Sequence, residues 1–279
     1  MPSPLTPRRG PIVPDLRAEL DVAVAAAEDA GDLLLEAFGR PVAERRKGRH
    51  DVVTELDRLS ERMIMDRLAT SFPRDARLGE ESGRSKTPPR GGGSGRTWIV
   101  DPLDGTINYA AGLPIWCVSV ALAIGPTVVL GVIRDPVHGA TFVATLGGGA
   151  WRASDRSAVA LRRPRRGADA VIVADPGDAD DADADARIRS LRPDVRAIRV
   201  LGSIAWSLTA LATGRLDGVL QVRGLQAVDV AAAGLIAREA GARVTASDGG
   251  PWIDLAKPST GRGIAAARPS IHRRLVSFG

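Results

Sequence analysis

The chain has 279 residues, of which 44% are hydrophobic and only 4% aromatic, and its formal net charge is +5. A chain of this length can form one large domain or two lobes around an aliphatic core. No run of about 18 apolar residues occurs, so we predict no membrane span and no membrane partner.

The cysteine and arginine residues indicate the cellular compartment and the kinds of partner. Cys117 is the single cysteine, so no intrachain disulfide can form, which favours a reducing compartment and predicts a cytoplasmic protein. Its apolar surroundings predict a buried, inert thiol. Basic runs occur at Arg45–Lys47 and Arg162–Arg166. No aromatic residues interleave with them as a stacking surface requires, so we predict no specific nucleic-acid partner.

The N-terminal third begins with a proline-rich segment, residues 1–14, that lacks the apolar centre of a signal peptide and predicts a disordered arm. Residues 15–39 carry apolar side chains at helical spacing, with Asp15 and Gly39 suited to the two ends, and predict a long amphipathic helix. We expect an N-terminal α+β lobe over residues 15–151 and a C-terminal α/β lobe over residues 152–279.

Residues 45–97 contain several short elements. The sequence predicts a strand at 52–54, a helix at 56–71 and an extended piece at 77–82 that ends in Glu80 and Glu81. Asp51 and Asp57 flank the join between strand and helix, where either can be a helix cap. Residues 83–97, rich in glycine, serine and proline, predict a loop.

The stretch Trp98–Gly112 is the centre of the functional interpretation. A predicted strand runs into two carboxylates three residues apart, Asp101 and Asp104, and then into a turn at Gly105. Mg²⁺ needs a rigid shell of oxygen ligands, and helix N–H groups beyond the turn can hold an anion beside it. Taken alone, the same residues are also typical of an ordinary turn.

The rest of the chain predicts strands at 115–124, 127–133 and 140–144, and then strands alternating with helices. The helices are expected at 184–191, 203–213 and 229–240, and the strands at 170–174, 195–200, 218–221, from 244 onward and at 264–267. This alternation is typical of an α/β unit.

Acidic residues at predicted strand ends and helix starts share one explanation. If they converge, they form an oxygen-only cage with too much negative charge to exist without cations. No cluster of histidine or cysteine accompanies them, so Mg²⁺ is favoured over zinc. These residues are Asp57, Glu80, Asp101, Asp104 and Asp229.

Four segments closely resemble the signatures of the inositol monophosphatase family, in the family's order and spacing. They are Trp98–Asn108 with Asp101-Pro-Leu-Asp-Gly-Thr106, Asp51–Asp57, Gly79–Ser82 and Asp229–Gly241. The resemblance implies a layered αβαβα sandwich like the inositol monophosphatase and fructose-1,6-bisphosphatase fold, usually a homodimer. It also implies a phosphoric monoester hydrolase that uses two or three Mg²⁺ ions on a small phosphorylated metabolite.

The resemblance further implies roles for individual residues. Glu80, Asp101 and the carbonyl of Leu103 resemble ligands of a first ion; Asp101, Asp104 and Asp229 resemble ligands of a second, and Glu80 helps to hold a third. Asp57 and Thr106 resemble the pair that orients the attacking water, with Glu80 also in the catalytic set. Substrate contacts are expected from Gly105, Thr106, Gly202, Ser203 and Asp229.

The sequence departs from the family on the substrate side. Val228 stands where tryptophan usually precedes the last aspartate, and Val222 stands seven residues before that aspartate, where inositol enzymes have a glutamate. Lys47 lies one residue closer to Asp51 than the lysine at the corresponding place in the family usually does. We therefore expect weak hydroxyl recognition near 221–226, with Arg223 either turned inward to an anion or solvated. Histidinol phosphate, fructose 1,6-bisphosphate and 3′-phosphoadenosine 5′-phosphate stay open as substrates, as does a non-catalytic, ligand-binding role.

Overall fold

The computed structural model describes residues 15–40, 44–46, 52–84, 94–161, 167–177, 181–258 and 261–277. The predicted N-terminal arm, Lys47, Asp51 and the basic run Arg162–Arg166 lie outside these residues. Within the described part, no helix combines the length and the apolar character needed to cross a membrane.

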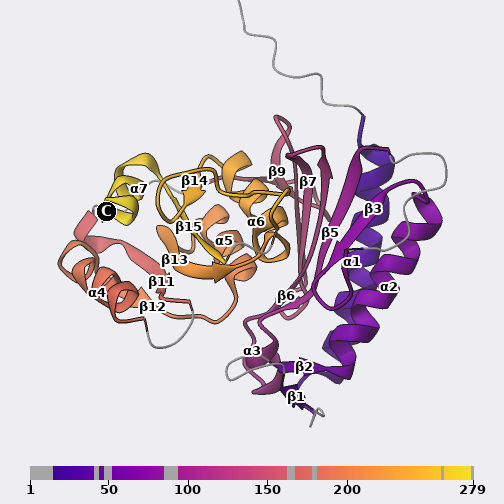
Figure 1. The fold of residues 1–279 in the computed structure, drawn as a ribbon, viewed down its shortest axis with the longest axis horizontal. Coiled ribbons are helices and arrows are strands. Elements are labelled where there is room, and N and C mark those ends of the chain that lie inside the picture. The colour runs from indigo at the N-terminus through magenta and orange to yellow at the C-terminus, as the bar shows by residue number, and fades with distance from the viewer. Residues whose placement is uncertain are drawn as a thin grey trace, which may run out of the picture.

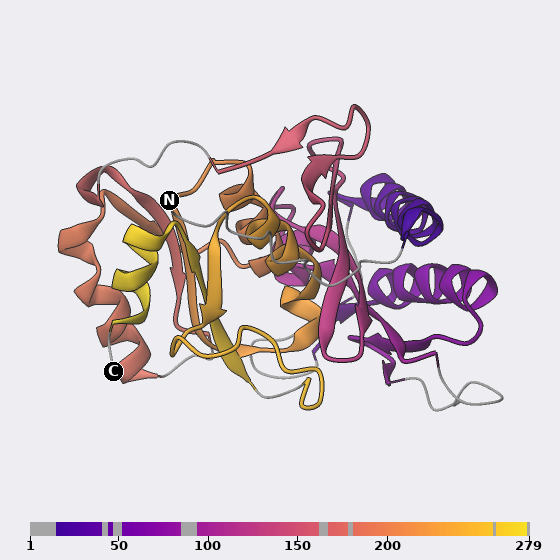
Figure 2. The same ribbon diagram turned by 90° about the horizontal axis from the view of Figure 1, so that it is seen from above.

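Five layers of helices and sheets alternate, as Figures 1 and 2 show, which confirms the αβαβα sandwich. Helices α1 (Arg17–Ala37) and α2 (Glu55–Ser71) cover the outer face of the larger sheet. Helices α5 (Ile204–Ala212) and α6 (Ala227–Glu239) lie between the two sheets. Helices α4 (Ala182–Ser190) and α7 (Pro269–Val276) lie beyond the smaller sheet.

The larger sheet has the strand order β10-β9-β8-β7-β6-β5-β3-β4. All its neighbours pair antiparallel except β3 and β5, which are parallel. The predicted loop at 83–97 is wrong at its ends, since β4 begins at Gly83 and β5 at Arg96. The strands are β3 (Ala76–Gly79), β4 (Gly83–Arg84), β5 (Arg96–Asp104), β6 (Cys117–Ile124), β7 (Thr127–Asp135), β8 (Ala140–Thr145), β9 (Gly149–Arg152) and β10 (Ala158–Val159).

The smaller sheet has the order β12-β11-β13-β15-β14 and is mixed. Its first three strands are parallel, whereas β15 runs antiparallel to both of its neighbours. The strands are β11 (Val171–Asp175), β12 (Ala197–Arg199), β13 (Gly218–Leu225), β14 (Arg243–Ala246) and β15 (Arg262–Ala267). A two-stranded ribbon, β1 (Glu44–Arg46) with β2 (Val52–Thr54), and short 3₁₀ turns at Gly167–Asp169 and Arg192–Asp194 complete these elements.

Helix α1 shows why the predicted elements form where they do. Its small apolar residues recur every three or four positions, so one face is buried against the sheet and the other is exposed. Asp15 does not occupy the capping position, which is Leu16, but its Oδ1 accepts a hydrogen bond from the Arg17 N–H at 3.1 Å. Gly39, with φ +80°, follows the end of the helix, where a left-handed residue is favoured.

Helix α6 approaches the larger sheet so closely that glycine is required on β7. A Cβ atom on Gly131 would lie 2.7 Å from the backbone oxygen of Ala232. The alanine-rich sequence of α6 and this glycine together bring the helix backbone against the strand. The start of α6, which carries Asp229, is thereby fixed relative to β5 and β6.

The boundary between the two lobes stays a prediction. The larger sheet continues past Trp151 through β9 and β10 to Val159, and α6 contacts strands of both sheets.

Candidate active site

A bulge at the end of β5 forms the floor of the site. The register between β5 and β6 shifts between Asp101 and Asp104, where Pro102 has no N–H to donate to the ladder. Asp101 is 2% exposed, and its Oδ1 accepts a hydrogen bond from the Leu103 N–H at 3.0 Å. Ser60 on α2 donates its hydroxyl to the Pro102 carbonyl at 3.1 Å, which fixes the bulge from outside.

The four predicted carboxylate ligands are close enough to influence one another. Burial raises the pKa of Asp101 well above its ordinary value, and the charges of Glu80, Asp104 and Asp229 raise it further. The backbone N–H of Glu80 donates to the Val100 carbonyl at 3.1 Å, which places Glu80 beside β5. The fold thus brings acidic side chains from β5, from α6 and from the residue after β3 into one region.

Asp104 is turned toward the start of α5. Its Oδ2 accepts hydrogen bonds from the Ser203 hydroxyl at 2.5 Å and from the Ala205 N–H at 2.7 Å. Burial raises the pKa of Asp104, while these hydrogen bonds lower it in part. A carboxylate at a helix N-terminus is stabilised by the unpaired N–H groups of the first turn.

Asp229 holds the start of α6 in a similar way. It is the third residue of the helix, and its Oδ2 accepts a hydrogen bond from the Gln226 N–H at 2.6 Å in a capping box. The helix begins two residues before the predicted start, so Asp229 projects from its first turn rather than preceding it.

The next question is whether these acidic side chains are arranged to bind a metal ion. Among the described residues, no group of three or more Asp, Glu, His or Cys side chains is arranged to hold one. Asp104 and Asp229 each direct one oxygen, Oδ2, to a helix N-terminus. The donor set nevertheless fits Mg²⁺, because it is made of oxygen ligands and because several carboxylates lie close enough to the buried Asp101 to disfavour its ionised form when no metal ion is bound.

Thr106 and Asp57 form the second predicted pair. The Thr106 hydroxyl lies 3.0 Å from Asp57 Oδ1 and 3.1 Å from the Leu103 carbonyl. Asp57 is 1% exposed. The pKa of the neighbouring Tyr109 is raised to about 12, first because Tyr109 is itself partly buried and second because of the negative charge of Asp57. The sequence prediction that Asp57 meets Thr106 from α2 agrees with this geometry.

Gly105 lets the chain turn tightly between β5 and α3 (Thr106–Ala110). Its φ is +96°, and a Cβ atom there would lie 2.8 Å from the Ile115 backbone oxygen. Asn108 on α3 donates from Nδ2 to the carbonyls of Ile115 and Leu201 at 2.8 and 2.7 Å. This amide ties the turn to the segment that leads into Gly202 and Ser203.

The first turn of α5 is held from the larger sheet as well. Trp206 donates its indole N–H to Asp135 Oδ2 at 3.1 Å, and the same carboxylate lies 2.9 Å from His138 Nδ1. The sequence prediction did not include these residues, because their function is to position α5 rather than to meet a ligand.

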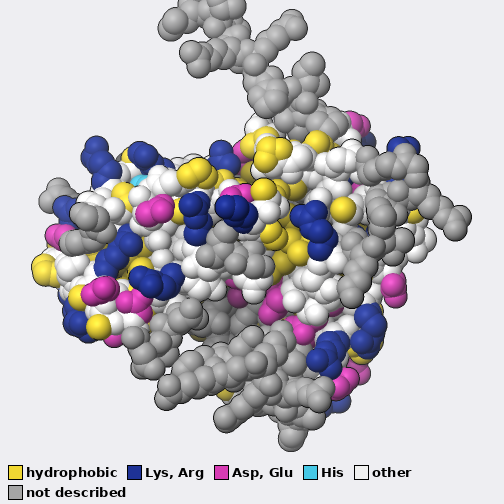
Figure 3. Space-filling model, in the orientation of Figure 1, with side chains coloured by type: hydrophobic (Ala, Val, Ile, Leu, Met, Phe, Trp, Pro, Cys, Tyr) yellow, Lys and Arg dark blue, Asp and Glu magenta, His cyan; other side chains and the backbone are white. Residues whose placement is uncertain are grey.

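A cavity of about 310 Å³ lies beside Asp104 and the starts of α5 and α6. In Figure 3, acidic side chains lie on the hollowed surface between the two halves of the molecule. The predicted residues that line the cavity are Asp104, Gly202, Ser203 and Asp229, and the further lining residues are Val173, Asp175, Gly177, Ile204, Ser207, Gln221, Gly224 and Leu225.

The expectation that Val222 faces the substrate is wrong. Val222 is 8% exposed and packs in the apolar cluster beyond the smaller sheet, whereas its neighbour Gln221 lines the cavity. Arg223 is half exposed and its Nε lies 2.7 Å from Asp181 Oδ2. Val228 is buried in the core between the sheets.

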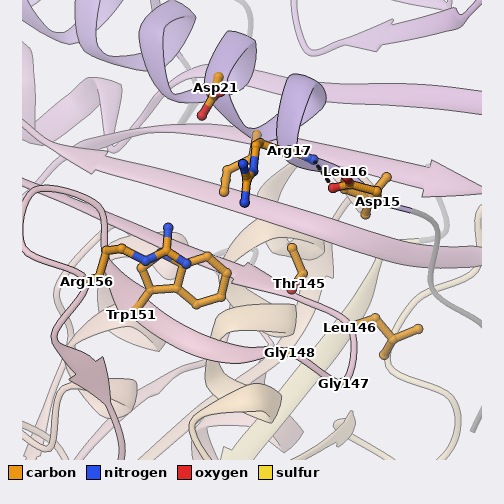
Figure 4. A pocket seen from close by; sticks show the side chains of 11 residues that line it. Asp15, Leu16, Arg17, Asp21, Thr145, Leu146, Gly147, Gly148, Trp151 and Arg156 are labelled. Atoms are coloured by element: carbon orange, nitrogen blue, oxygen red, sulfur yellow. Dashed lines mark hydrogen bonds between the residues drawn. The ribbon is translucent and has the colours of Figure 1, made fainter.

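A separate hollow of about 470 Å³ lies between the start of α1 and the turn from β8 to β9. Figure 4 shows the side chains that line it. Arg156 lies over the ring of Trp151 there, 5.3 Å from its centre. The predicted site residues do not line this hollow.

The inositol monophosphatase family model matches residues 15–277. The chain belongs to this family. Inositol monophosphatase 2 of Solanum lycopersicum is 35% identical over 262 residues, which cover 92% of this chain and 96% of the relative. Nus factor SuhB of Pasteurella multocida is 34% identical over 262 residues, covering 92% and 94%.

A solved structure of extragenic suppressor protein SuhB from Bartonella henselae has a TM-score of 0.84 and 32% identity, covering 93% of this chain and 97% of that one. These similarities support a phosphatase of the inositol monophosphatase type, a family that depends on Mg²⁺ in general.

Proposed function

We propose that the protein is a Mg²⁺-dependent phosphomonoesterase that hydrolyses a small phosphorylated metabolite. The observation that carries this proposal is the buried carboxylate cluster around Asp101 beside the Thr106–Asp57 pair. A phosphate dianion repels a nucleophilic oxygen, so its hydrolysis needs both neutralising cations and a positioned water.

The proposed ligands are Glu80, Asp101, the Leu103 carbonyl, Asp104 and Asp229. Bound Mg²⁺ would neutralise phosphate charge and make water acidic enough to attack at neutral pH. Either two or three ions fit the proposal. The hydrogen bonds to the helix N-termini occupy Oδ2 of Asp104 and of Asp229, and the second oxygen of each carboxylate is the proposed metal ligand.

The chain's own residues orient the water. The Thr106 hydroxyl can accept a hydrogen bond from water while donating its proton to Asp57 at 3.0 Å. In this arrangement Asp57 holds the hydroxyl in its accepting orientation. The backbone of Gly105 and Thr106 is proposed to meet the phosphate, with Gly202 and Ser203 beside the alcohol.

The test is phosphate release at varied Mg²⁺ from inositol 1-phosphate, histidinol phosphate, fructose 1,6-bisphosphate, 3′-phosphoadenosine 5′-phosphate and p-nitrophenyl phosphate. We expect Mg²⁺-dependent release that Asp101→Asn removes. Because one relative is named a Nus factor, a folded protein that releases no phosphate from any of these would favour a non-catalytic role and refute the proposal.

We also propose a cytoplasmic homodimer. Light scattering on the purified chain tests the oligomeric state, and a monomer at micromolar concentration would contradict it.

A further inference from the structure

An additional carboxylate, Asp175, stands in the wall of the active-site cavity. It is the last residue of β11 and lines the same cavity as Asp104 and Asp229. On the adjacent strand β13, Gln221 is its register partner and lines the cavity as well. The sequence prediction missed Asp175, because an aspartate at a strand end before proline is typical of a turn.

The hydrogen bonding of Asp175 fixes its orientation without neutralising it. Its Oδ1 accepts a hydrogen bond from the Gly177 N–H at 2.8 Å. Burial raises the pKa of its carboxyl group, and this one hydrogen bond lowers it in part. The cationic side chain closest in sequence on β13, Arg223, is paired with Asp181 instead.

The neighbouring strand supplies an amide beside this carboxylate. Gln221 donates from Nε2 to the Arg223 carbonyl at 3.3 Å. The register of β13 shifts between Arg223 and Leu225, with Gly224 at φ +86°. The bulge lengthens the path to Asp229, so Gln221 rather than Val222 faces the cavity.

We propose that Asp175 and Gln221 form the subsite for the leaving alcohol, and that this subsite selects uncharged, hydroxyl-bearing alcohols. The inference rests on the proposed phosphomonoesterase function. A carboxylate accepts hydrogen bonds from hydroxyl groups and repels a second anionic group on the substrate. Of the described residues that line the cavity, the charged ones are Asp104, Asp175 and Asp229, all acidic, so a second anionic group on the substrate meets carboxylates and no basic side chain from this part of the chain.

The experiment compares two substrates that differ at one group. Glycerol 2-phosphate has two uncharged CH₂OH arms, and 2-phosphoglycerate has a carboxylate in place of one of them. At saturating Mg²⁺ we expect the wild type to favour glycerol 2-phosphate in kcat/KM. Asp175→Asn should reduce this preference about ten- to hundred-fold, mainly through KM, because hydrogen bonds to charged groups contribute about that factor.

Asparagine preserves the structural role of Asp175, since its Oδ1 can still accept the Gly177 N–H. The loss of kcat/KM with p-nitrophenyl phosphate, whose alcohol has no hydroxyl donors, should be smaller than the loss with glycerol 2-phosphate, and an equal loss with both substrates would contradict the subsite. Asp217→Asn is the matched control, because Asp217 is also half-buried beside β11 and accepts a backbone N–H, from Val171 at 2.9 Å, but does not line the cavity. This control should leave the substrate preference unchanged.

The outcomes separate the two proposals. If the wild type hydrolyses p-nitrophenyl phosphate and Asp175→Asn leaves the preference unchanged, Asp175 only ends the strand and the subsite proposal is wrong. If the wild type hydrolyses none of these substrates, the proposed function fails first. Should Asp175→Asn melt below the assay temperature, Gln221→Ala replaces it, and an unchanged preference in that variant also overturns the subsite.

Discussion

Replacement of Asp101 by asparagine should stabilise the metal-free protein while abolishing its activity. Asp101 is buried among Glu80, Asp104 and Asp229, and both burial and these charges disfavour its ionised form. Asparagine keeps an Oδ1 acceptor for the Leu103 N–H, and its amide can donate to Glu80, which already shares a side-chain hydrogen bond with Asp101. The substitution therefore removes repulsion without leaving either partner unsatisfied.

The expected change in melting temperature follows from the size of the chain and from the stabilisation of the folded state by bound Mg²⁺. Each kcal/mol gained shifts the melting temperature by roughly 2–4 °C in a protein of about this size. In the wild type, Mg²⁺ at a hundred times its Kd adds about 2.7 kcal/mol, or roughly 5–10 °C. The variant should lose most of this Mg²⁺-dependent increase, because it lacks the charge of the ligand proposed to bridge two ions.

The assay is thermal unfolding of both proteins at pH 8, with EDTA and with excess Mg²⁺, beside phosphate release. Asp75→Asn is the control, because Asp75 is also buried but pairs with the Arg96 Nε at 3.1 Å and accepts the Trp98 indole N–H at 3.0 Å. Breaking a buried pair costs about 3–5 kcal/mol, so this variant should melt on the order of 10 °C lower.

Two results would refute the reasoning about Asp101. One is a variant that melts below the wild type in EDTA, and the other is an undiminished Mg²⁺-dependent shift. Turnover above about a tenth of the wild-type value at saturating Mg²⁺ would contradict its catalytic assignment, since a metal ion contributes several kcal/mol.

Thr106→Ala should lower kcat about 10²–10⁴-fold with little change in the Mg²⁺ concentration for half-maximal rate, because Thr106 is proposed to orient the attacking water; normal turnover at high Mg²⁺ would show a ligand role instead. Val222→Glu should destabilise the fold, since it places a carboxylate in an apolar cluster. It should leave the ratio of activity on inositol 1-phosphate to activity on p-nitrophenyl phosphate unchanged, and a changed ratio would show that Val222 faces the substrate. Burial lowers the pKa of His272 below 6.5, so the folded state binds this proton less readily than the unfolded state; stability should be complete above about pH 6.5 and fall as the pH decreases. In melting curves at pH 7.5 and 5, His272→Gln should lose less stability than the wild type, and an equal loss would assign the pH effect to other groups.

The candidate metal ligands on β5 could be located from the sequence because their geometry is encoded locally. Asp101, Asp104 and Gly105 lie in one short segment whose strand, bulge and turn follow from the order of the residues. Pairing with Asp57 or Glu80 requires the fold, and only the family resemblance supplied it at the sequence level. The structure agrees with the Asp57–Thr106 pairing and with the convergence of the acidic side chains.

The substrate side was harder to predict, because counting residues fails across a bulge. Seven positions before Asp229 is Val222, but the shift near Gly224 places Gln221 at the cavity. Helix α7 was also missed, since its polar sequence shows only a narrow apolar stripe at Ile271 and Leu275, although Pro269 is a typical first helical residue. The bulge could not be derived without knowing which strands are neighbours, whereas the signals for α7 are local but weak.

Helix α6 makes the two halves of the molecule inseparable. Most of its residues are buried, and it contacts strands of both sheets while carrying Asp229 at its start. A fragment that ends before Ala227 would leave the inner face of the larger sheet exposed to water, and a fragment that begins there would expose the helix. The halves should therefore neither accumulate separately on expression nor restore activity by simple mixing, and in denaturant the loss of phosphate release should coincide with the loss of helical circular dichroism.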